Sequence, residues 1–286
     1  MTIHNILYES TKALEAADIP TARLDAEVLL SFCLGCERLE FYKNPDKQIS
    51  ETQLATYRNL IARRLQWEPV AYITGRKEFW TFVLEVNNSV LIPRPDTEII
   101  VEEALDICRN FTSPDMRILD IGTGSGAIAL ALASEIDGAK VMATDISSTA
   151  LALAQKNAAA LGMKERIDFR QGNLFEPVNG LYDIIASNPP YIAASDYEEL
   201  PAAVKDFEPR EALLAGESGL EFYEKLIPSA AAYLKKNGWL LLEIGAKQEE
   251  GIRRILTASG FYDGIDLRRD YAGLARVIKA RRKVSG

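Results

Sequence analysis

The chain has 286 residues, 48% of them hydrophobic and 26% charged, which is typical of a globular protein with a sizeable core. Its net charge of −8 at pH 7 disfavours proteins whose main partner is bulk duplex nucleic acid, because these need a basic footprint. The sequence contains no run of 18 apolar residues and its first 20 residues lack the apolar core of a signal peptide, so we expect neither a membrane span nor secretion.

The few cysteines and the single histidine restrict the chemistry further. Three cysteines argue against a disulfide framework and favour a reducing, cytoplasmic location. Cys33 and Cys36 form a C-x-x-C, but no second pair completes a zinc site, so we interpret them as packed helical side chains. His4 alone cannot supply a Ser-His-Asp triad or a histidine metal cluster, so we expect no metal site.

The first segment of the chain, residues 1–75, has the 3.6-residue apolar period of helices, with breaks at Pro20 and Pro45. Ser50 followed by Gln53 predicts the start of one of these helices. We expect a separate helical domain over this range, and we expect it to recognise the substrate.

A β-hairpin is predicted over residues 76–94, as a linker between domains. Residues 78–86 are rich in aromatic and β-branched side chains, and residues 90–92 are apolar. The Asn-Asn-Ser sequence at 87–89 is expected to form the turn between them.

From residue 95 to residue 286, predicted strands alternate with helices, which is typical of an α/β fold with a doubly wound, mostly parallel sheet. The last two strands have no helix between them and are expected to pair antiparallel at the end of the sheet. The predicted strands are 117–121, 140–144, 166–170, 182–187, 238–244, 261–267 and 274–280. The predicted helices are 96–110, 126–135, 148–161, 219–235 and 246–259.

A glycine-rich loop follows the first of these strands and has the sequence Gly122-Thr123-Gly124-Ser125-Gly126. Glycines let the backbone turn sharply and approach a ligand, and the N–H groups of the loop and helix suit a negative group. Asp145 ends the next strand, where a carboxylate can accept hydrogen bonds from ribose hydroxyls. The pattern fits S-adenosylmethionine, but Gly122, Gly124 and Ala127 also match the nicotinamide fingerprint G-x-G-x-x-A.

A second motif, Asn188-Pro189-Pro190-Tyr191, follows the fourth strand. In the strand order 3-2-1-4-5-6, strands 1 and 4 are neighbours at the topological switch point. The loops that leave their carboxyl ends share one crevice, so we expect Asn188 beside the glycine-rich loop.

The residue types of this motif suit a planar NH2 group. The side-chain carbonyl of Asn188 and the backbone carbonyl of Pro189 can each accept a hydrogen bond from one NH2. Such contacts would orient the nitrogen and stabilise the positive charge that develops on it. The two prolines hold the backbone rigid, and Tyr191 offers an aromatic face. The motif therefore predicts methyl transfer to an amide or amino nitrogen.

In these motifs the chain resembles the release factor glutamine methyltransferases. The resemblance covers essentially the whole chain and rests on four segments, namely 91–98 (LIPRPDTE), 119–126 (LDIGTGSG), 187–192 (SNPPYI) and 208–213 (EPREAL). It implies a class I methyltransferase fold and S-adenosylmethionine as the methyl donor. It also implies a substrate, the side-chain amide of the glutamine in the Gly-Gly-Gln loop of peptide-chain release factors.

The resemblance also implies roles for individual residues. The catalytic residues would be Asn188, Pro189 and Tyr191, and together with Pro190 these would bind the glutamine. The donor would be bound by Gly122, Thr123, Gly124, Ser125, Gly126, Asp145, Asn173, Leu174 and Asn188. Asn173-Leu174 matches the position that caps the adenine, although many members have Asp and an aromatic residue there. Segment 91–98 either starts a helix at Pro95 and Asp96 or closes over the site.

Three other functions remain open at the level of sequence. The same tetrapeptide could hold the exocyclic amino group of a nucleic-acid base, but base flipping needs a basic groove. A nicotinamide-dependent oxidoreductase would explain the glycine-rich loop but not the tetrapeptide. A non-catalytic cofactor-binding or RNA-docking module is the third. We expect a monomer with release factors as partners, without membrane or direct nucleic-acid contact.

Overall fold

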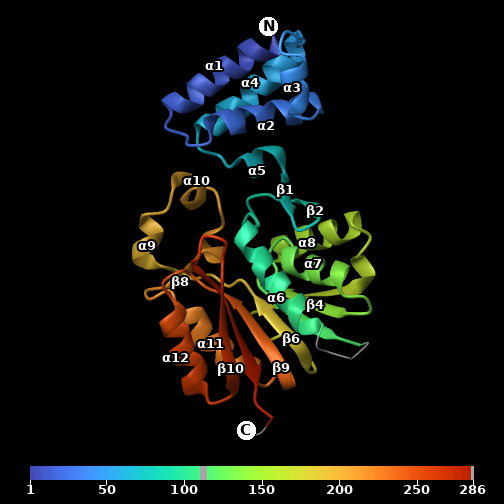
Figure 1. Cartoon of the computed structure of the whole chain (residues 1–286), viewed down its shortest axis with the longest axis vertical. Helices are drawn as coiled ribbons and strands as arrows, with labels where there is room; N and C mark the ends of the chain where they lie inside the picture. Colours follow the sequence, from blue (N-terminus) through green and yellow to red (C-terminus); the bar gives the residue numbers. More distant parts are fainter. Residues whose placement is uncertain (110–114, 285–286) are drawn as a thin grey trace. The chain divides into compact units, whose positions relative to one another are not determined.

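The computed structural model describes residues 1–109 and 115–284, which form two compact units (Figure 1). One unit contains Met1–Arg76 and Pro201–Phe207, and the other contains Lys77–Leu200 and Glu208–Gly286. Two predicted elements extend beyond the described residues. The predicted helix 96–110 includes residue 110, and the predicted domain 95–286 includes residues 110–114 and 285–286, which lie outside the described residues.

The first unit is built from helices around an apolar core. Ser50 accepts a hydrogen bond from the Gln53 N–H and Gln53 accepts one from the Ser50 N–H, which confirms the predicted helix start. Cys33 and Cys36 are partly buried against this core, as expected. The helices are α1 (Ile3–Ala16), α2 (Ala22–Leu34), α3 (Leu39–Lys43), α4 (Glu51–Leu65), α5 (Val70–Thr74) and α10 (Ala202–Lys205).

The hairpin consists of β1 (Arg76–Phe79) and β2 (Phe82–Glu85), and its turn is Trp80–Thr81. The predicted turn at 87–89 is therefore wrong. The reason is a contact distant in sequence: the Trp80 N–H donates to the Glu98 carboxylate at 2.8 Å, and Trp80 has a φ of 55°. A turn held by a distant side chain leaves no local signal such as Asn-Gly.

The second unit contains a seven-stranded sheet in the order β10-β11-β9-β6-β3-β4-β5, which confirms the predicted doubly wound, mostly parallel sheet. β3 pairs in parallel with both β4 and β6. β10 and β11 pair antiparallel as expected, but β11 lies between β9 and β10, so this edge departs from the order 3-2-1-4-5-6. The strands are β3 (Arg117–Ile121), β4 (Lys140–Asp145), β5 (Ile167–Gln171), β6 (Tyr182–Ser187), β9 (Leu234–Glu243), β10 (Tyr262–Arg269) and β11 (Ala275–Arg282).

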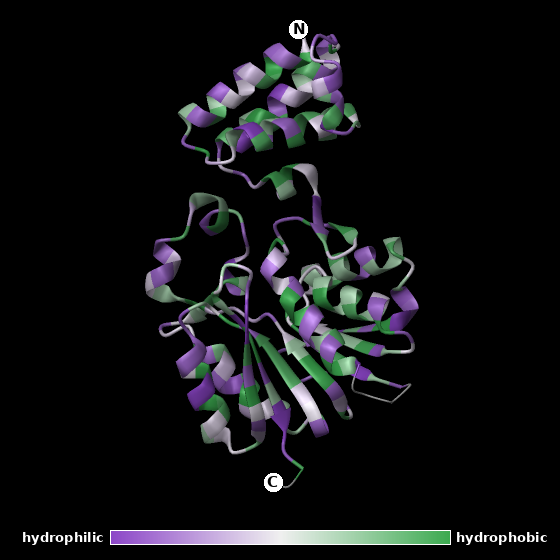
Figure 2. Ribbon diagram, viewed as in Figure 1, coloured by the Kyte–Doolittle hydropathy of each residue, from purple (hydrophilic) through white to green (hydrophobic). Residues whose placement is uncertain are grey.

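Both faces of this sheet are buried. Ile118 packs into one apolar cluster and its neighbour Leu119 into the other, and Ile184 and Ile185 divide in the same way. Two covered faces explain the continuous apolar runs in the strands, which Figure 2 shows as largely hydrophobic. The covering helices are α6 (Glu98–Cys108), α7 (Ala127–Glu135), α8 (Ser148–Ala160), α11 (Glu221–Ala230) and α12 (Glu249–Ser259). Within the described residues, none of the helices has both the length and the hydropathy that a membrane crossing requires.

The predicted helix 219–235 is wrong at its carboxyl end, because α11 ends at Ala230 and β9 begins at Leu234. Leu234 pairs with Tyr182 of β6, and this long-range pairing overrides the local pattern. The sequence also missed the elements between 164 and 216, which are too short to show a repeating apolar pattern. These are η2 (Lys164–Arg166), β7 (Ile192–Ala193), α9 (Ala194–Glu198), η3 (Arg210–Ala212) and β8 (Leu214–Gly216), and η1 (Pro95–Thr97) precedes α6.

Asn157 of α8 connects the hairpin to the glycine-rich loop. Its Oδ1 accepts a hydrogen bond from the Glu85 N–H at 2.8 Å, and its Nδ2 donates to the carbonyl oxygens of Glu85 and Ser125 at 3.0 and 2.9 Å. The side chain is buried, so these backbone groups would lose their partners if it were removed. One amide therefore fixes both segments against α8.

We expect Asn157→Leu to lower the free energy of unfolding by about 2–3 kcal/mol, because the apolar side chain leaves buried backbone groups unpaired. Urea denaturation measures this change. Lys156→Ala is the matched control, because Lys156 makes only an exposed ion pair with the Glu85 side chain, and such pairs contribute about 0–1 kcal/mol. Equal effects of the two substitutions would contradict the role of Asn157.

Candidate active site

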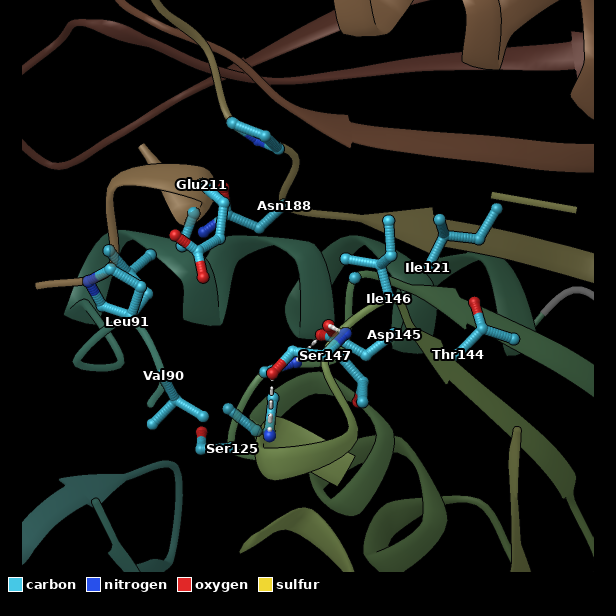
Figure 3. Close-up of a pocket in the computed structure, with 18 of the residues that line it drawn as sticks. Val90, Leu91, Ile121, Ser125, Thr144, Asp145, Ile146, Ser147, Asn188 and Glu211 are labelled. Carbon is cyan, nitrogen blue, oxygen red and sulfur yellow. Dashed lines mark hydrogen bonds between the residues drawn. The ribbon is translucent and has the colours of Figure 1, made fainter. Parts of the chain in front are cut away.

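A cavity of about 340 Å³ lies where β3, β4 and β6 end (Figure 3). This volume is within the range of small-molecule sites. The structure brings the glycine-rich loop and Asn188 together in its wall, since β3 and β6 are adjacent parallel strands. Of the predicted site residues, Gly122, Thr123, Gly124, Ser125, Asp145, Asn173, Leu174, Asn188 and Pro190 line the cavity.

The three glycines of the loop have positive φ values but different roles. Gly122 and Gly124 have φ of 73° and 57°, and a Cβ added to either would meet no atom within 4 Å. They therefore face open space, which a ligand can approach closely. A Cβ on Gly126 would lie 3.1 Å from the Leu130 side chain, so this glycine allows α7 to pack closely.

Four amides of the loop make hydrogen bonds inside the protein. The N–H groups of Gly122 and Thr123 donate to the Thr144 carbonyl, that of Gly126 to the Thr123 carbonyl, and that of Gly124 to Asp145. These groups fix the shape of the loop. The expectation that the loop amides meet a negative group of the ligand is therefore not supported for these four.

Asp120 stabilises the loop from inside. Its Oδ2 accepts hydrogen bonds from the Thr123 hydroxyl at 2.6 Å and from the Ala129 N–H at 3.2 Å. The side chain is fully buried, and this burial raises the pKa of Asp120 to about 7. The loop is thus held by a carboxyl group that is costly to ionise.

Asp145 ends β4 and lines the cavity, as predicted for a ribose-binding acid. Its two oxygens accept hydrogen bonds from the N–H groups of Gly124 and Ser147, each at 2.9 Å. Burial raises the pKa of Asp145 above its usual value. A carboxylate oxygen accepts more than one hydrogen bond, so Asp145 keeps capacity for ribose hydroxyls. The adjacent Ile146 is an apolar wall of the cavity although 62% of it is exposed.

Asn173 and Leu174 line the cavity, at the position predicted to cap an adenine. Leu174 has a φ of 51°, which is uncommon for a residue other than glycine and often marks a functional site. The Asn173 N–H donates to the Glu176 carboxylate at 3.0 Å.

The tetrapeptide divides between the cavity and the core. Asn188 and Pro190 line the cavity, and Pro189 is buried. Tyr191 is outside the described lining: its ring packs against the core, its hydroxyl donates to Glu243 at 3.4 Å, and burial raises its pKa. Tyr191 is thus anchored through its hydroxyl, and its role as an aromatic face for the substrate stays a prediction. Asn188 donates from Nδ2 to the Thr97 hydroxyl at 3.2 Å, which directs its carbonyl end away from Thr97.

Two segments that the family resemblance singled out contribute to the wall. Leu91, Pro93 and Thr97 come from segment 91–98, and Pro209, Glu211 and Ala212 come from segment 208–213. Glu208 joins the segments, because its carboxylate accepts hydrogen bonds from the Ile92 N–H at 3.1 Å and from Arg94. Segment 91–98 therefore both precedes a helix and lines the site.

Several residues of the wall were assigned no role from the sequence. Among them, Glu211 brings a second carboxylate into the cavity and raises the pKa of Asp145 (Figure 3). Ser147 and Phe222 also line it. They lie in loops or at the start of a helix, where no periodic pattern marks which side chains point inward.

Comparisons with known proteins agree with this geometry. The family described as "PrmC N-terminal domain" matches residues 5–75, and "Methyltransferase small domain" matches residues 104–207. The release factor glutamine methyltransferase of Geobacter sulfurreducens is 42% identical, over 98% of this chain and 96% of its own. That of Moorella thermoacetica is 40% identical, over 99% of both chains. The N-terminal domain of human METTL16, solved with SAH, shares the fold with a TM-score of 0.51 at 18% identity, over 69% of this chain and 74% of its own.

We expect Asp120→Asn to weaken the pH dependence of stability. The folded protein holds the Asp120 proton up to a pKa of about 7, against 3.8 ordinarily. Stability is therefore fully present below pH about 4 and falls, by at most about 4 kcal/mol, as pH rises through about 7. Chemical denaturation between pH 4 and 8 should show a shallower decline in the variant. If the stability of the wild type and of the variant fell equally between pH 4 and 8, this would contradict the raised pKa of Asp120.

Proposed function

This chain belongs to the release factor glutamine methyltransferases, and we propose that it methylates the side-chain amide of the glutamine in the Gly-Gly-Gln loop of peptide-chain release factors. The observation that supports this most strongly is the placement of Asn188. Its amide nitrogen donates a hydrogen bond to the Thr97 hydroxyl, and Asn188 lines a cavity formed partly by the glycine-rich loop. The side-chain carbonyl of Asn188 is then an acceptor that suits the NH2 group of an incoming substrate.

The cavity has suitable partners for S-adenosylmethionine, which supplies an electrophilic methyl group on a positively charged sulfur when bound. Asp145 offers acceptors for ribose hydroxyls, and Ile146 and Leu174 offer apolar surface for an adenine. The carboxylates of Asp145 and Glu211 favour a cationic ligand. Open space above Gly122 and Gly124 allows close approach to the backbone.

The reaction requires orientation more than a strong base, because an amide lone pair is delocalised. The side-chain carbonyl of Asn188 and the backbone carbonyl of Pro189 would accept the two hydrogens of the glutamine NH2. These contacts would fix the plane of the amide and stabilise positive charge on its nitrogen. Tyr191 would act by anchoring the end of the tetrapeptide through Glu243.

The helical unit is proposed to recognise the release factor outside the methylated loop. Residues 5–75 match the N-terminal domain of this family, so a helical unit of this kind occurs in proteins that have this activity. The described cavity is lined entirely by residues of the other unit. The helical unit is therefore available for contacts with the rest of a protein substrate.

Labelled S-adenosylmethionine should transfer its methyl group to a purified bacterial release factor, and not to a factor whose loop glutamine is replaced by alanine. Asn188→Ala should lower the rate at least about 100-fold, because it removes an acceptor in the transition state. Its affinity for S-adenosylhomocysteine, measured by calorimetry, controls for folding. Label on neither factor but on RNA or DNA would instead favour methylation of a nucleic-acid base.

Removal of residues 1–75 should lower kcat/KM for the whole release factor at least about 10-fold, the effect of losing about 1.4 kcal/mol of binding. It should leave kcat/KM for a short Gly-Gly-Gln peptide unchanged, and unchanged cofactor affinity would show that the remaining chain is folded. An equal loss on both substrates would rule out a recognition role.

A further inference from the structure

The side-chain amide of Gln248, just before α12, joins the end of the tetrapeptide Asn188–Tyr191 to two neighbouring segments. Its Nε2 donates hydrogen bonds to the carbonyl oxygens of Tyr191 and Gly219, at 2.8 and 3.0 Å. Its Oε1 accepts a hydrogen bond from the Gly245 N–H at 2.9 Å. Both hydrogens of the NH2 group and the carbonyl oxygen of this amide are thus engaged.

The backbone groups around Gln248 determine which way its amide points. A backbone carbonyl can only accept a hydrogen bond, and a backbone N–H can only donate one. The NH2 end must therefore face Tyr191 and Gly219, and the carbonyl end must face Gly245. The Gln248 N–H also donates to the Gly245 carbonyl at 2.9 Å, so backbone and side chain bind the same glycine. The amide therefore has a single orientation.

Two glycines leave the space that this amide occupies. A Cβ added to Gly219 would lie 2.7 Å from the Tyr191 carbonyl oxygen and 2.8 Å from Gln248 Nε2, and Gly219 has a φ of 77°. A Cβ added to Gly245 would lie 3.0 Å from Gln248 Oε1. Glycine at both positions therefore allows Gln248 to bond to three segments of the chain at once.

The tetrapeptide depends on contacts at its two ends, because its prolines have no N–H group and cannot donate a backbone hydrogen bond. On the amino side, Ser187 is paired with the neighbouring strands of the sheet. On the carboxyl side, the Tyr191 carbonyl is held by Gln248, and the Ile192 N–H donates to a backbone carbonyl at 2.9 Å. The Pro189 carbonyl lies between these anchors, so its position depends on them.

We infer that Gln248 is a positioning residue, which fixes the carboxyl end of the tetrapeptide and through it the Pro189 carbonyl. The inference rests on the proposed function, in which that carbonyl accepts a hydrogen of the substrate NH2. Gln248 is outside the described lining of the cavity. It therefore acts through the tetrapeptide and not by contact with the donor.

Two substitutions of Gln248 in the full chain test the inference. Gln248→Met keeps the length of the side chain but removes its donors and its acceptor, and Gln248→Glu keeps an acceptor while its carboxylate lacks both donors. A reacting group displaced by about 1 Å can cost about 100-fold in rate, and here Ile192 still anchors the segment. We therefore expect each variant to lower the single-turnover rate of methyl transfer to the release factor about 10-fold.

The affinity of both variants for S-adenosylhomocysteine should equal that of the wild type, because Gln248 does not line the cavity. Lys247→Met is the matched control, since the neighbouring Lys247 is exposed and receives the same replacement. It should keep the wild-type rate. Wild-type rates in the Gln248 variants would overturn the inference. An equal loss of rate and of cofactor affinity would also overturn it, because it would indicate a general disturbance of the site.

A spectroscopic measurement tests the bond itself, whatever the substrate. A chain labelled with 13C at the tyrosine carbonyls and 15N at isoleucine gives one signal for each Tyr-Ile pair, and the sequence has two such pairs, Tyr72-Ile73 and Tyr191-Ile192. The second signal, identified by its loss in Tyr191→Phe, should shift in both Gln248 variants but not in Lys247→Met. The first signal serves as the reference. An unshifted second signal would overturn the inference even if release factors are methylated.

The identity of the methylated substrate separates this inference from the proposed function. If RNA or DNA accepted the methyl group in place of a release factor, and the Gln248 variants slowed that transfer about 10-fold, the inference would stand and the proposed function would fail. If the variants methylated a release factor at the wild-type rate, the proposed function would stand and the inference would fail.

Discussion

The parallel pairing of β3 with β6 is the constraint on which the site depends. Ile121 and Ser187 are partners in this pairing, so the two strands end side by side and their loops open at one edge of the sheet. The hydroxyl of Ser187 also donates to the Ile121 carbonyl at 2.7 Å, which ties the two ends together. The glycine-rich loop and the tetrapeptide are 62 residues apart (188 − 126) in the sequence, yet this pairing makes them walls of the same cavity.

Polar side chains then hold each loop in place. Asp120 and Asn157 bond to the glycine-rich loop from its protein side, and Gln248 donates to the Tyr191 carbonyl at 2.8 Å. These loops lack the regular hydrogen bonds of helices and strands, so their shape depends on such side chains. The resulting site is preorganised, which matters for a reaction whose catalysis rests on orientation.

The sequence predicted the features that follow from short-range patterns. The sheet strands, the helix start at Ser50 and the shared crevice of the two motifs follow from periodicity, capping and the switch-point rule. The turn at Trp80 and the start of β9 at Leu234 depend on partners far along the chain, Glu98 and Tyr182. Contacts of that kind leave no local pattern. For the same reason the sequence identified Tyr191 as part of the motif but did not indicate that its ring packs into the core.

The geometry of the glycine-rich loop also bears on the class of ligand. A dinucleotide places its pyrophosphate on free amides of such a loop and on the start of the following helix. Here the amides of Gly122, Thr123, Gly124 and Gly126 are hydrogen-bonded within the protein, and the carboxylates of Asp145 and Glu211 line the cavity. A pyrophosphate would meet negative charge where it needs donors, whereas a sulfonium would be attracted. The same strand, loop and helix therefore serve different ligands, according to where the loop amides and the nearby carboxylates point.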